Sequence, residues 1–336
     1  MQASQETDNG SWPSSRVSPP RSKTASGGWA RNRTASANFA LLKSITETLA
    51  GRAIYFELEP FTRRELANRR PATAVLRQLF DGAKIVEESP AEQIGVREVI
   101  LGGLPQVRLH PSTDPSLWFR GYVQTYLERD VRELSPLIDL VAFRDVVRLA
   151  ALRTGQVLNS SELARDAKQN STTTSRYLSV LEAPFVIRRL TPYLANRASR
   201  IIKSPKLYMT DSGLAAHLIG LTQADAAQDP CWGALLESYV AQNLAGILAA
   251  EWPGAKLHYW HVQGRYEVDF VIESGRDCMA IEVKASPRWS ERDLLGLVSF
   301  LQKTPRCRVG VLAYGGRDII HLGDRLWAVP MPVLLA

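Results

Sequence analysis

The sequence predicts a mixed α/β protein, and three observations support that class. The last third contains helical and strand-like stretches in the order α-β-β-β-α-β. The middle third places two short helical patterns before two strand-like segments. Apolar residues make up 45% of the 336 residues, which is enough for more than one hydrophobic core. We therefore expect about two or three domains.

The N-terminal third divides into two parts. Residues 1–33 are rich in Ser, Pro, Gly and Arg and have no hydrophobic period, so we expect them to be disordered or artefactual. Residues 34–135 show folded patterns. These are a helical pattern over 40–49, a short strand over 54–58, a capped helical turn over 62–66 and an amphipathic helix over 118–134.

Residues 136–215 predict a winged helix-turn-helix. A helix over 141–154 leads to two short helices at 160–164 and 171–181, and strands follow at 186–190 and 207–209. Thr172, Thr173 and Arg176 stand near the start of the second short helix, where small hydroxyls and arginine suit DNA contacts. Further basic residues that could hold the DNA backbone are Arg188, Arg189, Arg197, Arg200, Lys203 and Lys206. Docking on a protein partner is the alternative use of such a module.

Residues 228–336 predict a third domain. Helices are expected over 234–250 and over 291–302, where Ser290 is the cap, and strands over 257–262, 266–273, 278–285 and 308–314. A turn at 274–277 makes the second and third strands a hairpin, so Asp269 and Glu282 are expected side by side. Alternation puts Glu267 on the face of Asp269, and Val268, Phe270 and Ile272 on the other.

Three carboxylates and a lysine in this domain predict a metal-dependent catalytic site. Clustered carboxylates repel one another unless a divalent cation neutralises them, and oxygen ligands suit Mg²⁺ or Mn²⁺. We expect Glu237, Asp269 and Glu282 to hold the metal and Lys284 to orient the attacking water. The alternative is a solvated strand face with a cross-strand ion pair. The element order together with these acids resembles the PD-(D/E)XK nuclease core.

Charge and cysteine usage indicate the compartment and the class of partner. The net charge of +7 favours a polyanionic partner, and we expect DNA. The three cysteines lack metal-ligand spacing, which indicates reduced thiols and a cytoplasmic protein. No apolar run is long enough to cross a membrane, so no membrane association is expected.

Several motifs in order also resemble prokaryotic AAA-type ATPases that carry a C-terminal domain of unknown function, DUF4143. The motifs are residues 126–132 (YLERDVR), 206–214 (KLYMTDSGL), 267–270 (EVDF) and 282–284 (EVK). The resemblance spans about residues 34–315 and implies that 34–135 is a remnant of the ATPase domain with its helical lid. The family's P-loop, however, has no counterpart, because G-x-x-x-x-G-K-[ST] occurs nowhere in the chain.

The missing P-loop leads us to expect a truncated or frame-shifted gene, or a start assigned too late. ATP is then a cofactor only if an N-terminal segment is restored. Three functional hypotheses follow. The chain is a DNA-binding protein with a metal-dependent nuclease-like domain, a non-catalytic DNA- or protein-binding regulatory module, or an ATPase completed by a partner encoded upstream. A homo-oligomer is expected if the chain assembles as AAA proteins do.

Overall fold

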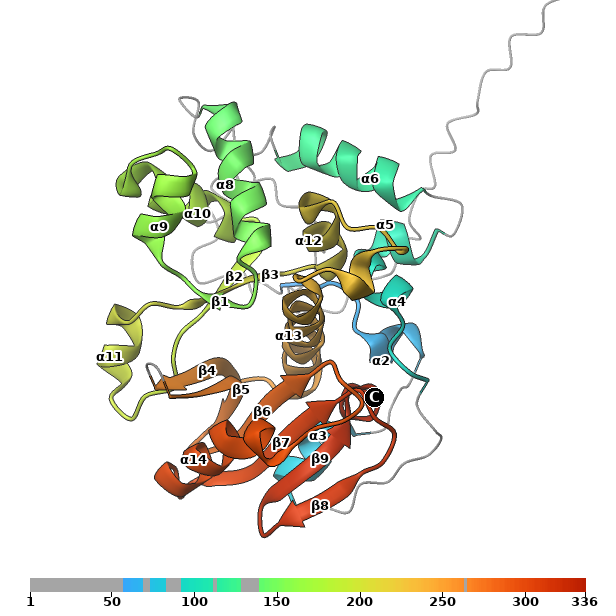
Figure 1. Cartoon of the computed structure of the whole chain (residues 1–336), viewed down its shortest axis with the longest axis vertical. Coiled ribbons are helices and arrows are strands. Elements are labelled where there is room, and N and C mark those ends of the chain that lie inside the picture. The colour runs from blue at the N-terminus through green and yellow to red at the C-terminus, as the bar shows by residue number, and fades with distance from the viewer. Residues whose placement is uncertain (1–56, 69–72, 83–91, 111–113, 128–138, 263–264) are drawn as a thin grey trace, which may run out of the picture. The chain divides into compact units, whose positions relative to one another are not determined.

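The computed structural model describes residues 57–68, 73–82, 92–110, 114–127, 139–262 and 265–336 (Figure 1). These residues belong to one compact unit, Ala37–Ala336. Helices combine with two β-sheets in it, so the expected mixed α/β class is confirmed. Expectations for residues 1–56 lie outside the described residues, and Glu57 and Leu58 are not part of a strand.

Short helices make up the first part of the described chain. They are α2 (Arg63–Leu66), α3 (Val75–Phe80), α4 (Val96–Leu101), α5 (Pro105–Arg108), α6 (Pro115–Gly121) and the π-helix η1 (Tyr122–Leu127). The predicted cap at α2 is a capping box, because the Thr62 hydroxyl accepts from the Glu65 N–H and the Glu65 carboxylate accepts from the Thr62 N–H. The single helix expected over 118–134 is instead α6 followed by η1, and residues 128–134 lie outside the described part.

The middle of the chain builds a small sheet together with the four helices α8 to α11. The elements are α8 (Leu140–Leu152), β1 (Gln156–Val157), α9 (Ser160–Asp166), α10 (Ser171–Glu182), β2 (Ile187–Leu190), α11 (Arg197–Ile202) and β3 (Lys206–Met209). The strand order is β1-β3-β2 and both pairings are antiparallel. Phe143 and Tyr177 meet edge to face at 5.6 Å between their ring centroids, in the core that joins α8 to α10.

Helix α13 (Trp232–Glu251) lies between the helical region and the larger sheet (Figure 1). It follows α12 (Ser212–Ile219) and the 3-10 turn η2 (Ala226–Gln228). Residues on every side of α13 from Leu235 to Leu248 are buried, as expected for a helix enclosed by other elements. Its Asn243 side chain accepts from the Arg63 N–H at 2.6 Å, so the first described elements are attached directly to α13.

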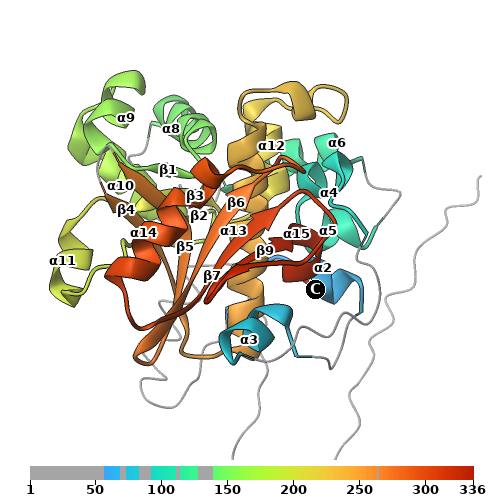
Figure 2. The same ribbon diagram turned by 60° about the horizontal axis from the view of Figure 1, so that its bottom comes forward.

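The larger sheet follows the predicted order α-β-β-β-α-β from α13 onward. Its elements are β4 (Lys256–Val262), β5 (Tyr266–Ser274), β6 (Asp277–Lys284), η3 (Glu291–Leu294), α14 (Leu295–Lys303), β7 (Cys307–Tyr314), β8 (Ile320–Gly323), β9 (Leu326–Pro330) and α15 (Met331–Leu334). The strand order is β4-β5-β6-β7-β9-β8, with parallel pairing of β6, β7 and β9. Figure 2 shows α14 in front of the strands and α13 behind them. No helix of the described chain is long and apolar enough to cross a membrane.

Strand β5 departs from the alternation that the sequence predicts. Phe270 and Ile272 lie in the core cluster that includes α13, whereas Val268 lies in the second cluster, with Leu297 and Phe300 of α14. The expectation that Val268 shares a face with Phe270 is therefore wrong. The physical reason is an irregular pairing, because the register of β4 against β5 shifts between His258 and Trp260.

The small sheet is joined to the edge of the larger one. After β2 the chain forms a parallel bridge between Pro192 and Tyr259, and the Tyr193 N–H donates to the Tyr259 carbonyl at 2.6 Å. These bonds pair part of the otherwise open edge of β4. The Arg200 guanidinium of α11 strengthens the junction through an ion pair with Glu273 of β5 at 2.6 Å. The middle region is thus fixed against β4 and β5, where the candidate site lies.

Candidate functional site

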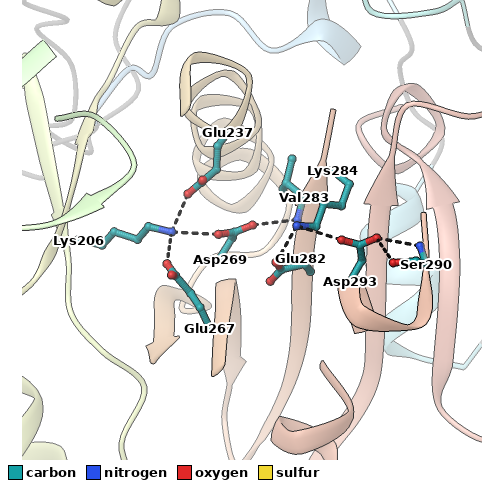
Figure 3. A network of polar contacts seen from close by, with 9 residues as sticks. All are labelled: Lys206, Glu237, Glu267, Asp269, Glu282, Val283, Lys284, Ser290 and Asp293. Carbon is teal, nitrogen blue, oxygen red and sulfur yellow. Dashed lines mark hydrogen bonds and ion pairs between the residues drawn. The ribbon is translucent and has the colours of Figure 1, made fainter. Parts of the chain in front are cut away.

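Four carboxylates gather where α13 meets β5 and β6, and we call them the acid cluster: Glu237, Glu267, Asp269 and Glu282 (Figure 3). The pairing of Phe270 with Ile281 brings Asp269 and Glu282 side by side, as the sequence indicates. The Asp269 carboxylate also accepts from the Val283 N–H at 2.9 Å. Three elements therefore converge on one site.

The centre of the acid cluster is occupied by the ammonium group of Lys206 from β3. Its Nζ lies 2.8 Å from Glu237, 2.6 Å from Glu267 and 3.0 Å from Asp269 (Figure 3). The Lys206 side chain is only 2% exposed. The expectation that Lys206 holds a DNA backbone is wrong, because its side chain is buried. One sequence feature indicates that Lys206 is buried: the other residues of its strand, KLYM, are apolar.

The remaining members of the site have unequal surroundings. The Tyr208 hydroxyl donates to Glu237, so this carboxylate has a second partner besides Lys206. One oxygen of Glu282 is buried and has no hydrogen-bond partner. Lys284 stands at the outer edge, 4.0 Å from Glu282 and 3.4 Å from Asp293, which caps the helical turn at Ser290. Lys284 is thus closer to Asp293 than to the acid cluster.

The pKa values follow from burial and from the excess of negative charge. Burial first, and then Asp269, raises the pKa of Glu237 to about 8 and that of Glu282 well above its usual range. Burial disfavours the charge on Lys206, but the surrounding anionic groups, Asp269 foremost, raise its pKa overall. Three of the four carboxylates contact Lys206, so negative charge exceeds positive charge in the acid cluster, and this excess favours the protonated forms of Glu237 and Glu282.

The arrangement bears directly on the expected metal site. A divalent ion held by Glu237, Asp269 and Glu282 would need the oxygens of Glu237 and Asp269 that now contact Lys206. Within the described residues, no group of three or more His, Cys, Asp or Glu side chains has a spacing suited to a metal ion. The residues therefore do not fit a divalent ion as they stand, since the ammonium takes its position.

The residues expected to contact DNA have different surroundings. Thr172 and Arg176 are exposed on α10, and Thr173 is half-buried. Arg188 forms an ion pair with Glu59, and Arg189 forms one with Glu182. The exposed hydroxyls along α10 belong to Ser171, Thr172, Ser175 and Ser179. The polar face of α10 is accessible, whereas the two strand arginines are half-buried and paired with carboxylates.

Two family models match the chain. Residues 232–334 match a domain of unknown function, DUF4143, and residues 96–225 match another, DUF8612. The acid cluster lies within the first of these, and Lys206 lies within the second. The C-terminal part of the resemblance is thereby confirmed. Neither model is that of an ATPase domain, so the ATPase part stays a prediction.

Two mycobacterial proteins are similar to most of the chain. They are the uncharacterized proteins Mb2031c of Mycobacterium bovis and Rv2008c of Mycobacterium tuberculosis, each 31% identical over 303 residues. The match covers 89% of this chain and 62% of each relative, so the chain spans less than two thirds of their length. No solved structure matches the chain significantly.

Proposed function

We propose that this chain is a non-catalytic DNA-binding module in which Lys206 replaces the metal ion of a nuclease-like site. The observation that carries the proposal is the Lys206 ammonium within 3.0 Å of three carboxylates. Such a triad of ion pairs joins β3 of the middle region to α13 and β5. The acid cluster then serves to fix the middle region in place rather than to cleave a phosphodiester bond.

The accessible face of α10 supports DNA as the partner. Its N-terminal turn is capped by the Asn170 side chain, which accepts from the Thr173 N–H, and it presents Thr172 and Arg176 outward. Helix α9 precedes it and the β2–β3 pair follows it, which is the element order of a winged helix-turn-helix. The net charge of +7 favours association with a polyanion.

Fluorescence anisotropy of labelled duplex DNA tests this proposal. We expect binding to weaken as salt rises, to be unchanged by EDTA, and to fall in Arg176→Ala. Asp269→Asn, with folding checked by circular dichroism, should bind as the wild type does because no residue of the acid cluster belongs to α9 or α10. Binding abolished by EDTA, or equal in Arg176→Ala and wild type, would count against the proposal.

A metal-dependent nuclease is the second candidate, and the unpartnered oxygen of Glu282 favours it. Mg²⁺ or Mn²⁺ would supply charge neutralisation and an activated water there, once Lys206 had left the acid cluster. Manganese binding followed by electron paramagnetic resonance separates the two candidates. Binding by the wild-type chain, lost in Asp269→Asn, supports the nuclease. Binding that appears only in Lys206→Met supports the replacement of the metal by lysine.

An ATP-dependent activity belongs to a third candidate, in which a P-loop polypeptide completes the protein. The relatives are longer than this chain, which leaves room for such a part in them. A cytoplasmic location and assembly into an AAA-type oligomer are further proposals that accompany this candidate. Co-purification of an ATPase polypeptide with the chain from its native host would support this candidate, and isolation of the chain alone would argue against it.

A further inference from the structure

A groove of about 430 Å³ is lined by residues of α6, η1, α8 and α12. We call it the arginine groove. Three arginines, one histidine and one glutamine contribute to its wall, together with apolar side chains. The members used in the argument are Arg120, Arg144, Arg148, His217, Phe143 and Val147.

The charge in the arginine groove is of one sign. None of the described residues that line it is acidic. Arg144 and Arg148 stand four residues apart on α8 and so share a helix face, and Arg120 comes from α6. Across the described part of the chain, no ion pair joins Arg120 or Arg148 to a carboxylate. Arg120 and Arg148 are both close enough to His217 to lower its pKa, and an anion bound between these two guanidinium groups would be attracted by both.

His217 lies within reach of the same charges. Its ring stacks on Phe119, with 5.6 Å between the centroids and 25° between the planes. Burial first, and then Arg120 and Arg148, lowers the pKa of His217, so both guanidinium groups act on this ring. A neutral imidazole supplies one donor and one acceptor without adding charge. The groove therefore combines two unpaired guanidinium groups with a neutral hydrogen-bonding ring.

We propose that the arginine groove binds a small organic phosphate with a flat apolar body. Guanidinium groups match the geometry of phosphate oxygens and form charge-assisted hydrogen bonds with them. Phe143 and Val147 give the body an apolar wall. The volume lies in the range of small-molecule sites, roughly 300–1,000 Å³. This inference goes beyond the DNA-binding proposal and does not depend on it.

Isothermal titration calorimetry with AMP as the probe tests the inference, because AMP joins one phosphate to an aromatic base. Adenosine is the matched ligand without charge, and inorganic phosphate is the matched anion without the base. The test variants are Arg120→Gln and Arg148→Gln. Arg165→Gln is the control, since Arg165 is an exposed arginine on α9 outside the groove.

We expect AMP to bind more tightly than inorganic phosphate and adenosine to show no measurable binding. Each groove variant should weaken AMP binding by about tenfold or more, while Arg165→Gln leaves it unchanged. Circular dichroism confirms that the variants are folded. Three results would overturn the inference: no AMP binding by the wild-type chain, equal binding in all variants, or adenosine binding as well as AMP. Displacement of AMP by duplex DNA, with loss of DNA binding in both groove variants, would instead assign the groove to a nucleic-acid surface.

Discussion

At the scale of single residues, the charge of Lys206 is balanced by side chains from two elements, Glu237 on α13 and Glu267 with Asp269 on β5. A buried ion pair contributes little net stability, but removal of one partner leaves uncompensated charge in a medium that cannot solvate it. Because Lys206 has three partners, its removal leaves three carboxylates facing one another. Loss of the Lys206 charge should therefore destabilise the site more than loss of the hydrophobic contacts of its side chain would.

Lys206→Met tests this reasoning. We expect the free energy of unfolding to fall by ~3–5 kcal/mol, because the substitution removes the charge that balances the carboxylates while it keeps most of the apolar part of the side chain. Urea unfolding at pH 7 measures the change. Lys203→Met is the control. Lys203 precedes Lys206 in the sequence and is exposed, so its substitution should change the free energy of unfolding very little. An equal effect of both substitutions would contradict a special role for Lys206.

The raised pKa of Glu237 makes stability depend on pH. Its folded pKa is about 8, above its usual value near 4.5, so the folded state holds a proton that the unfolded state has lost. The contribution of Glu237 to the free energy of unfolding is fully present below the pKa that this group has in the unfolded state. It is lost as the pH rises through the pKa of the folded state. Stability should therefore decline between about pH 5 and pH 8, by at most about 1.4 kcal/mol per pH unit from this group.

Glu237→Gln, which cannot ionise, should remove that decline. Urea unfolding of both proteins at pH 5.5, 6.5 and 7.5 measures it, and the difference between them should grow with pH in favour of the variant. Parallel stability curves for wild type and Glu237→Gln would show that another group carries the pH dependence.

At the scale of elements, α12 begins at a carboxylate that holds two parts of the chain together. The Asp211 side chain caps α12 by accepting from the Leu214 N–H at 2.7 Å, and it accepts from the Gly103 N–H at 2.7 Å. Gly102 has φ +64°, and a Cβ there would lie 2.4 Å from the Asp211 carboxylate. The turn after α4 therefore requires glycine, and Asp211 satisfies backbone groups that are buried on both sides.

Asp211→Ala should lower the free energy of unfolding by ~2–4 kcal/mol, because it removes a cap and leaves a second buried N–H without an acceptor. Asp139→Ala is the matched control, since Asp139 caps α8 at an exposed site and has no partner in a distant segment among its described bonds. That control should cost about 1 kcal/mol. Thermal or urea unfolding of both variants gives the comparison, and equal losses would mean that the bond to Gly103 contributes nothing.

Local patterns predicted most of these elements, and long-range packing explains what they did not predict. Alternation and capping residues located β5, β6, α13 and the turn at Ser290, because each signal lies within a few residues of the element it defines. The partner of Asp269 did not follow from such signals, since Lys206 is separated from it by 63 residues in sequence. The irregular pairing of β4 with β5 could not be predicted from local patterns either, because it depends on the register between the two strands.

At the scale of the whole molecule, the middle region and the larger sheet share several buried contacts. Lys206 enters the acid cluster, Arg200 pairs with Glu273, and residues 191–193 bond to β4. Regions joined by buried ion pairs and backbone bonds tend to open together rather than separately. The described parts of residues 139–336 should therefore behave as one cooperative unit, in spite of their division into a small and a large sheet.

Hydrogen exchange followed by mass spectrometry tests this cooperativity. In the wild-type chain, peptides from β3 and from β5 should exchange with similar protection, because both are released by the same opening. In Lys206→Met, protection of β3 and of α8, which packs against it, should fall by more than that of β7, which carries no residue of the acid cluster and keeps its neighbours β6 and β9. A uniform loss of protection would indicate only general destabilisation. Unchanged protection in β3 would mean that the ion pairs of Lys206 do not hold the two regions together, and the structural role proposed for the acid cluster would fail with it.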